Sequence, residues 1–226
     1  MLLISATDEW RTAHPGAIIG LLELSGVENT QVSPKLDERK RETEARLRER
    51  YKKFSRQDFS ALPVMSSYRQ YYKRFDMTFH VLLQVESIAL KGKRLPNVSP
   101  LVDANFVAEV ETFVLTAGHD ADKLHGALAI DVSREGDQMT QLNGASKVIH
   151  AGDMIMRDAN GVACSILYGQ DNRSPITSAS RHVLYVAYAP VGVSSESVET
   201  QLNKIEEHVR LFVPTAVVEQ HRLISA

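Results

Sequence analysis

Four side chains able to bind a metal ion or transfer a proton lie within seven residues, at His119, Asp120, Asp122 and His125. Imidazole and carboxylate groups are ligands for zinc and related metals, but such sites usually draw ligands from more than one turn of chain. The sequence has no H-E-x-x-H pair and no second cysteine to complete a site. We therefore predict no metal and no cofactor, and expect a turn in which the aspartates hydrogen-bond their own backbone.

The residues alone supply no evident nucleophile and base. The chain has no G-x-S-x-G elbow, Walker loop or Rossmann fingerprint, and its glycines stand singly at turns. Its one cysteine, Cys164, lies in the apolar run from 162 to 167. A buried thiol is the expected state there, and a single cysteine fits a reducing cytosol.

Composition is ordinary for a globular protein of one core, with 226 residues, 43% of them hydrophobic and 24% charged. The first sixteen residues carry charges where a signal peptide needs an apolar stretch. No apolar run approaches the roughly 20 residues that span a bilayer. The sequence therefore predicts a cytoplasmic protein that does not enter a membrane.

Positive charge is concentrated in one stretch, residues 35–74, which holds 13 Lys or Arg against six acids. The rest of the chain carries a net charge of −9, because the total is −2. Such asymmetry suits a face that contacts phosphates. A solvated surface helix explains the stretch equally well, since Glu42–Arg46 and similar pairs lie at the favourable i,i+4 spacing.

Helices are predicted for much of the first half. A buried strand is expected at 17–27, and helices at 35–53, 66–75 and 78–90. Another helix is expected to begin near Asp103 and end at Gly118, with Asp103 or Asn105 as its N-cap. Tyr68, Tyr71 and Tyr72 alternate with basic residues, a mixture that suits base stacking but more simply predicts packing with a wet edge.

Short apolar runs between turn residues dominate the second half. Strands are predicted at 127–132, 154–157, 162–167 and 182–189, with Asn160-Gly161 as a two-residue hairpin. Residues 198–212 have helical spacing and stop at Pro214. We predict one α+β domain, helical first and then strand-rich, with a mostly antiparallel or mixed sheet.

Five segments in order resemble a known family: GKRLPNVSPLVDANF, HDADKLHG, SREGDQMTQLNG, GDMIMRDANGVACSILYGQD and SRHVLYV. The set is similar to the B3/B4 domain of the bacterial phenylalanyl-tRNA synthetase beta subunit. The resemblance covers residues 66–190. It implies an N-terminal extension at 1–65, a strand and a charged helix packed on the core. Residues 191–226 are predicted from their helical spacing to form a C-terminal amphipathic helix and tail.

The resemblance also implies a function. The synthetase domain binds tRNA and hydrolyses tyrosine wrongly attached to the phenylalanine tRNA, using a positioned water rather than a triad. We therefore expect tRNA or aminoacyl-tRNA as the partner, with trans editing by an aminoacyl-tRNA deacylase as the candidate activity. The basic residues expected to contact the tRNA lie within 35–74: Arg46, Arg50, Lys53, Arg69, Lys73 and Arg74.

The implied substrate pocket follows the family's motifs. It is expected where the helix-start asparagine, the D-[KR]-[IL]-x-G turn, the E-G-[ED] strand end and the Gly-rich loop converge. The residues of this chain at those places are Asn105, Asp122, Gly126, Glu135, Gly169, Gln170 and Asp171. Asp158 corresponds to the acid before the tight turn, where a turn-forming role is the simpler expectation.

Two departures leave the chemistry open. The family's pocket histidine falls here on Ala117, with His119 two residues later, and the family's loop glutamate is Gln170. His119 and Gln170 are therefore the candidate catalytic residues, and tyrosine specificity is not carried over. The alternatives are a non-enzymatic module that binds a free amino acid or related small molecule, and an interaction domain that keeps only the fold.

Overall fold

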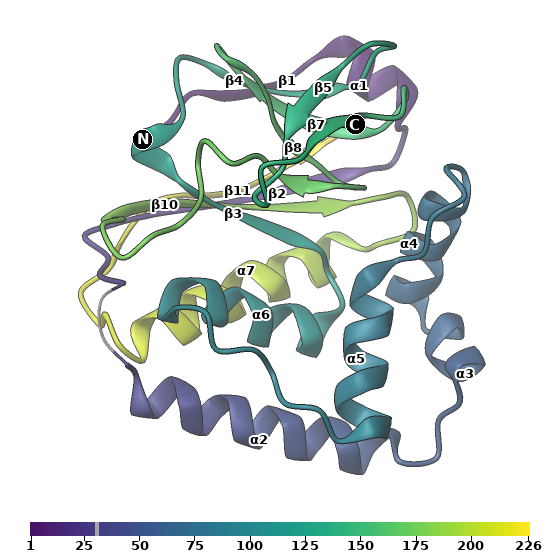
Figure 1. The fold of residues 1–226 in the computed structure, drawn as a ribbon, viewed down its shortest axis with the longest axis vertical. Helices are drawn as coiled ribbons and strands as arrows, with labels where there is room; N and C mark the ends of the chain where they lie inside the picture. Colours follow the sequence, from purple (N-terminus) through teal and green to yellow (C-terminus); the bar gives the residue numbers. More distant parts are fainter. Residues whose placement is uncertain (30–31) are drawn as a thin grey trace.

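Two β-sheets and a layer of helices build the chain, with a four-stranded sheet in the middle (Figure 1). The computed structural model describes residues 1–29 and 32–226. A five-stranded sheet lies on one side of the central sheet, and helices α6 and α7 cover the other side (Figure 1). This arrangement confirms the α+β class with antiparallel and mixed sheets.

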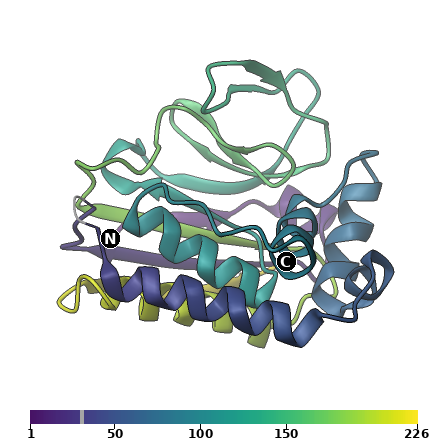
Figure 2. The ribbon, with the colours of Figure 1, turned by 60° about the horizontal axis from the view of Figure 1, so that its bottom comes forward.

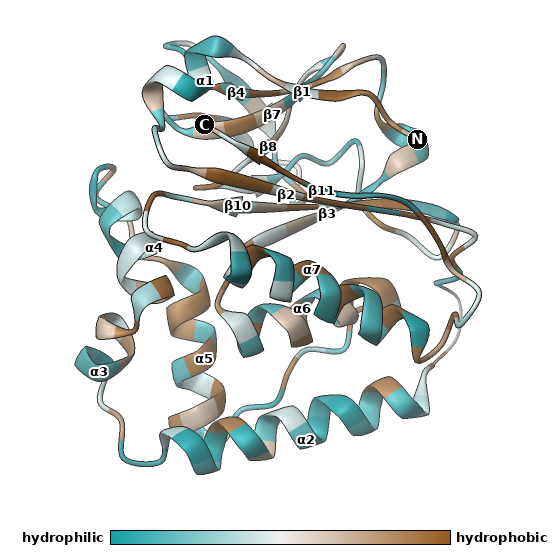
Figure 3. Cartoon of the chain, turned by 180° about the vertical axis from the view of Figure 1, so that it is seen from behind, coloured by the Kyte–Doolittle hydropathy of each residue, from teal (hydrophilic) through white to brown (hydrophobic). Residues whose placement is uncertain are grey.

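The central sheet is antiparallel throughout. Its strands, in spatial order, are β11 (Val217–Ser225), β2 (Ile18–Ser25), β10 (His182–Ala189) and β3 (Thr116–Asp120). Strands β2 and β10 are nearly continuous apolar runs because both of their faces are buried between layers. Figure 3 shows this concentration of hydrophobic residues on the central strands.

The second sheet is mixed. Its strands, in spatial order, are β1 (Ile4–Ala6), β4 (Leu128–Val132), β7 (Met154–Asp158), β8 (Gly161–Ser165) and β9 (Gly169–Gln170). Only β1 and β4 pair in parallel. The predicted hairpin between β7 and β8 is present, but its two-residue turn is Ala159-Asn160 rather than Asn160-Gly161, because Gly161 already pairs with Asp158. Asp158 Oδ1 accepts a hydrogen bond from the Asn160 N–H at 2.9 Å. Strands β5 (Gln138–Thr140) and β6 (Ser146–Val148) form a separate hairpin.

The helices gather mainly on one side of the central sheet. They are α1 (Asp8–Ala13), α2 (Pro34–Tyr51), α3 (Arg56–Ala61), α4 (Pro63–Lys73), α5 (His80–Lys91), α6 (Pro100–Thr112) and α7 (Ser195–Arg210). The charged helix α2 lies across α6 (Figure 2). It begins one residue before the predicted range of 35–53, with Pro34 in the first turn and Ser33 Oγ accepting from the Leu36 N–H.

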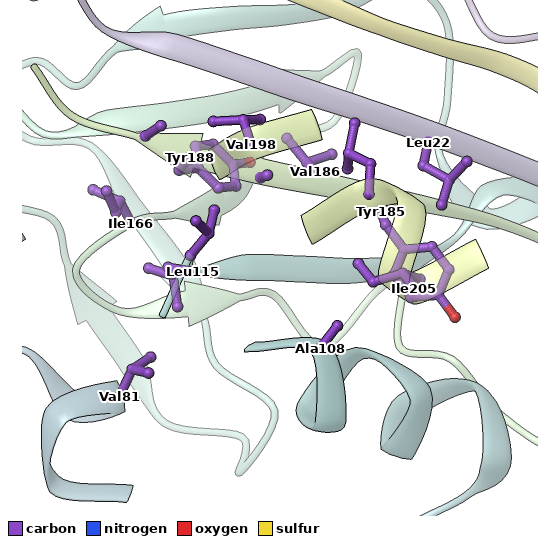
Figure 4. Packing of buried hydrophobic residues seen from close by; sticks show 14 of the residues in the cluster. Leu22, Val81, Ala108, Leu115, Ile166, Tyr185, Val186, Tyr188, Val198 and Ile205 are labelled. Atoms are coloured by element: carbon purple, nitrogen blue, oxygen red, sulfur yellow. The ribbon is translucent and has the colours of Figure 1, made fainter. Parts of the chain in front are cut away.

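Helix α7 approaches β2 closely because position 20 is glycine. A Cβ built on Gly20 would lie 2.5 Å from Val198 Cγ1 and 3.1 Å from Leu202 Cδ1. Val198 and Ile205 of α7 pack on the face of the central sheet that carries Leu22 of β2 and Tyr185 of β10 (Figure 4). Any side chain at position 20 would push the helix off the sheet.

The tyrosines of α4 pack in the core, as the simpler interpretation predicted. All three are buried. The Tyr68 hydroxyl donates to Tyr188 O at 2.7 Å. The Tyr71 hydroxyl donates to Asp153 Oδ1 at 2.7 Å, and the Tyr72 hydroxyl donates to Ile166 O at 2.5 Å. These bonds fix α4 to strand β10 and to the second sheet, so the rings are not free to stack on bases.

Two predicted boundaries of α6 are wrong, and one strand was not predicted. Helix α6 begins at Pro100 with Ser99 as its N-cap, so neither Asp103 nor Asn105 caps it. It ends at Thr112 because Phe113 adopts a left-handed conformation with φ of 67°, and Gly118 lies in strand β3 instead. The C-terminal tail is a strand, β11, that pairs with β2 along its length.

The central sheet draws strands from all three stretches of the predicted division at residues 65 and 190. That division stays a prediction. No helix in the described part of the chain is long and apolar enough to cross a membrane.

Candidate functional site

A cavity of about 430 Å³ lies between α6 and β3 on one side and the β8–β9 segment on the other. Its walls are mostly apolar and include Phe106, Leu115, Ile166 and Tyr185. Pockets for small ligands commonly have volumes of roughly 300–1,000 Å³, apolar walls and a few polar groups. This cavity has those properties, and its polar groups determine which ligand it suits.

Glu109 is the acidic side chain among the cavity-lining residues, and it is 3% exposed. Its Oε2 accepts a hydrogen bond from the Thr116 N–H at 3.1 Å. Its Oε1 makes no hydrogen bond with any described residue. Burial raises the pKa of this carboxyl to about 8, and the hydrogen bond from Thr116 lowers that pKa by a smaller amount. Glu109 is therefore mostly protonated at pH 7 and keeps one oxygen for a ligand or a water.

Asn105 lines the same cavity, but its amide is already engaged. Its Nδ2 donates to Thr116 O at 2.8 Å, and its Oδ1 accepts from Gln201 Nε2 at 3.3 Å. Gln201 also donates to Thr116 Oγ1 at 3.0 Å. Asn105 thus joins α6, β3 and α7, and it positions the cavity wall.

Strand β9 contributes both of its residues, Gly169 and Gln170, to the cavity. The predicted pocket residue Asp171 lies behind them, buried, with its Oδ1 accepting from the Ser174 N–H at 3.2 Å and the Ser174 hydroxyl at 3.0 Å. Its Oδ2 pairs with Arg173 Nε at 2.5 Å. Asp171 therefore shapes the loop that carries Gln170.

His119 does not line the cavity. It is fully buried, and its Nδ1 lies 2.8 Å from Ser174 Oγ. Burial lowers the pKa of this imidazole to about 4, so it is neutral at pH 7. The position of the family's histidine, Ala117, does line the cavity. The side chain of His119 contacts Ser174, which precedes the cavity-lining Pro175.

The other predicted pocket residues lie outside the cavity. Asp122 contacts His182 Nδ1 at 3.1 Å on the surface, Gly126 is at a turn with φ of 73°, and Glu135 is exposed in the loop after β4. The expected Asp turn is present, because Asp120 Oδ1 accepts from the Asp122 N–H at 3.2 Å. Among the described residues, no three His, Cys, Asp or Glu side chains are placed to hold one metal ion.

Cys164, Ser165 and Thr116 are the cavity-lining residues with a thiol or an aliphatic hydroxyl, and none is activated. The Thr116 hydroxyl donates to Val114 O at 3.3 Å and accepts from Gln201 Nε2. Burial raises the pKa of the Cys164 thiol to about 12, which confirms the predicted buried thiol. The Ser165 hydroxyl donates to the buried carboxyl group of Asp153, so it is not directed at a substrate in the cavity. A covalent mechanism has no nucleophile among these described residues.

The six basic residues predicted to contact tRNA are all exposed, on or just beyond α2 and α4. Arg46 is bound to Glu111 and to Thr43 Oγ1, the latter at 2.8 Å. Arg74 lies over the Tyr71 ring, 5.5 Å from its centroid, and Arg50 lies 5.2 Å from the Tyr51 centroid. Except for Arg46, none of the six forms an ion pair with a described residue.

Comparison with known proteins identifies the family. The sequence profile of the B3/4 domain matches residues 79–209. The chain belongs to the B3/4 domain family. The matched range of this B3/4 domain contains α5, α6, both sides of the cavity and most of α7.

A phenylalanine–tRNA ligase beta subunit from Tropheryma whipplei (strain Twist) is 28% identical over 115 residues. Those residues are 50% of this chain and 12% of that protein, so this B3/4 domain corresponds to a small part of its relative. Among solved structures, an N-terminal fragment of the phenylalanyl-tRNA synthetase beta subunit from Pyrococcus horikoshii gives a TM-score of 0.49. It is 8% identical, over 97% of this chain and 54% of the fragment.

The Glu109→Gln variant should be less sensitive to rising pH than the parent. Glu109 ionises near pH 4.5 in an unfolded chain and near pH 8 in the folded protein, so folded stability falls as pH rises through that window. The loss amounts to at most about 5 kcal/mol. Glutamine still accepts from the Thr116 N–H and does not ionise.

Urea unfolding of both proteins at pH 5 and pH 8 measures this effect. The free energy of unfolding should drop more for the parent than for Glu109→Gln between the two pH values. Comparing the two proteins cancels the other groups that titrate in this range. Equal drops would show that Glu109 is already ionised in the folded protein at pH 5.

Proposed function

We propose that this B3/4 domain binds tRNA, takes up the aminoacyl group in the cavity beside α6, and hydrolyses its ester bond in trans. Membership of the B3/4 family supports the tRNA part, as does the relative whose name gives phenylalanine and tRNA as its substrates. The proposed reaction attaches water to the acyl carbon and returns free amino acid and tRNA.

The observation that carries the proposal is the cavity itself. Apolar walls enclose about 430 Å³, and one half-satisfied carboxyl group, Glu109, meets that space. A carboxyl with a pKa of about 8 is well matched to exchanging a proton with water near neutral pH. Since the described cavity residues include no activated nucleophile, we assign Glu109 to the attacking water and Gln170 to contact with the acyl group.

A second candidate function is binding of a free amino acid or related small molecule without hydrolysis. Two residues favour it, because Ala117 stands where the resembling family has a histidine, and Gln170 is uncharged where that family has a glutamate. A neutral amide forms weaker hydrogen bonds than a carboxylate. Calorimetric binding of free amino acids without any deacylation would favour this function.

Filling the cavity should abolish hydrolysis. We expect the parent to deacylate at least one member of a panel of labelled, mischarged tRNAs that includes tyrosyl-tRNA(Phe). Ala117→Phe places an aromatic ring in the cavity, so the rate should fall roughly tenfold or more. The measurement is release of labelled amino acid per minute under single-turnover conditions.

The matched control is Ala151→Phe, the same substitution at an exposed turn outside the cavity. It should stay within about twofold of the parent, since it leaves the acyl group's position unchanged. Equal activity of Ala117→Phe and the parent would place hydrolysis elsewhere. Absence of hydrolysis with every substrate would remove the enzymatic part of the proposal.

Reversing the charges on α4 should weaken tRNA binding. The variant carries Arg69→Glu, Lys73→Glu and Arg74→Glu, all at exposed positions. The slope of log affinity against log salt should become shallower by about one for each tRNA phosphate that the variant no longer neutralises. Filter binding of tRNA between low and moderate salt measures both quantities.

A control with the same change in net charge reverses Lys91, Lys93 and Arg94, which are exposed at the end of α5 and in the loop after it. It should retain more of the affinity than the α4 variant. Equal losses in the two variants would mean that only net charge matters, and unchanged affinity of the α4 variant would exclude α4 from the interface.

A further inference from the structure

A second cavity, of about 530 Å³, adjoins the first. Val98 and Ile176 line both, so the two spaces meet at these side chains. The second cavity lies between the beginning of α2, the segment before α6, and the segment from 176 to 178. Neither the proposed hydrolysis nor the binding of the acyl group gives this second cavity a role.

The second cavity differs from the first in its chemistry. Its lining residues include Ser33, Asp37, Asn97 and Ser178, so polar side chains form a larger share of its wall. The carboxylate of Asp37 forms no hydrogen bond or ion pair with any described residue. It is an open acceptor for hydroxyl groups.

Buried contacts fix the floor of this cavity. Lys40 Nζ donates to Pro96 O at 2.6 Å, to Asn97 Oδ1 and to Asp103 Oδ2 at 2.7 Å. Asp103 Oδ1 accepts from the Val98 N–H at 2.9 Å. Because Lys40 occupies the Asn97 oxygen, the Asn97 amide nitrogen is the group left to donate outward.

A second set of bonds ties the cavity's three borders together. Asn29 Nδ2 donates to Ser99 Oγ and to Thr177 O, both at 3.0 Å, and its Oδ1 accepts from the Leu101 N–H at 2.9 Å. The groups that line the cavity therefore have defined places before any ligand arrives. Such preorganisation reduces the entropy that binding loses.

We propose that the second cavity binds the terminal nucleoside of the aminoacyl-tRNA while the first cavity takes the amino acid side chain. This inference rests on the proposed function and names its substrate as an aminoacyl-nucleoside ester. An ester of this kind joins an apolar side chain to a ribose with a free hydroxyl and a base with donors and acceptors. The two adjoining cavities offer an apolar space and a polar space in the same order.

The charge of the second cavity selects the nucleoside over a phosphate. Asp37 and Asp103 line it, and the buried cation beside them, Lys40, is already bound to Asp103. Carboxylates repel a phosphate group but accept hydrogen bonds from ribose hydroxyls. We assign Asp37 to the ribose and Asn97 to a base or sugar acceptor.

The test compares three probes by calorimetry on the full chain: phenylalanine amide, adenosine, and phenylalanine joined by a stable amide to 3′-amino-3′-deoxyadenosine. The parent should bind the conjugate about tenfold or more tighter than phenylalanine amide. Asp37→Ala should lose about tenfold in affinity for the conjugate and for adenosine, and keep its affinity for phenylalanine amide. The matched control is Glu38→Ala, one residue further along the same helix, exposed and outside the cavity.

The outcomes separate this inference from the proposed function. Equal affinity of the parent for the conjugate and for phenylalanine amide, or equal behaviour of Asp37→Ala and Glu38→Ala, overturns the nucleoside site and leaves the acyl cavity standing. Adenosine binding that depends on Asp37, without any binding of phenylalanine amide, supports the nucleoside site and contradicts the acyl cavity for this amino acid. Binding of none of the three probes contradicts both.

Discussion

Helix α6 is buried on nearly every side, so each of its polar side chains must find a partner away from water. Asp103 meets the ammonium group of Lys40, and Asn105 meets Thr116 and Gln201. Glu109 finds a partner for one oxygen only. The first two residues hold α2, β3 and α7 in place around α6. The third is left half-satisfied where the wall opens into the cavity.

This constraint explains why stability and function meet on one helix. Burial favours the uncharged form of Glu109. As pH rises through the range where the group ionises, the stability of the fold falls. A residue that only filled space would be apolar at this position and would carry no such penalty. Retaining a carboxyl there is reasonable if the group meets a ligand or a water, which is the role we assign to it.

The same helix separates the two cavities. Residues at its beginning, together with the loop that Lys40 fixes, line the polar space, and later residues line the apolar space. The family match, residues 79–209, covers α6 and the lining of the apolar cavity, whereas the polar cavity is also lined by residues from the stretch 29–37, outside that match. At the wall of the apolar cavity Ala117 and Gln170 are not ionisable, and Glu109 is the carboxyl group that lines the space.

The sequence predicted the elements with strong local signals. Helix α2 begins at Pro34 after Ser33, β7 and β8 form the predicted hairpin with its turn one residue earlier than expected, and the apolar runs of β2 and β10 lie in the central sheet. The end of α6 was mispredicted because Phe113, which is not glycine, adopts the left-handed conformation that terminates it. Strand β11 was missed because it lies at a sheet edge and mixes polar with apolar residues.

The site prediction depended on motif order, and tertiary contacts bring only some of the predicted pocket residues to one cavity. Asn105, Gly169 and Gln170 do line one cavity, whereas Asp122, Gly126 and Glu135 lie elsewhere on the surface or at turns. Glu109 was overlooked because a glutamate in a helix normally faces water. Its position within the apolar run from 106 to 114 was the signal that it is buried.

The most direct test of the account is a crystal structure of the protein with the phenylalanine–3′-amino-3′-deoxyadenosine conjugate. The account predicts the phenyl ring between α6 and the β8–β9 segment, with the amide link beside Glu109. A conjugate bound elsewhere, with the cavity holding only water, would contradict it.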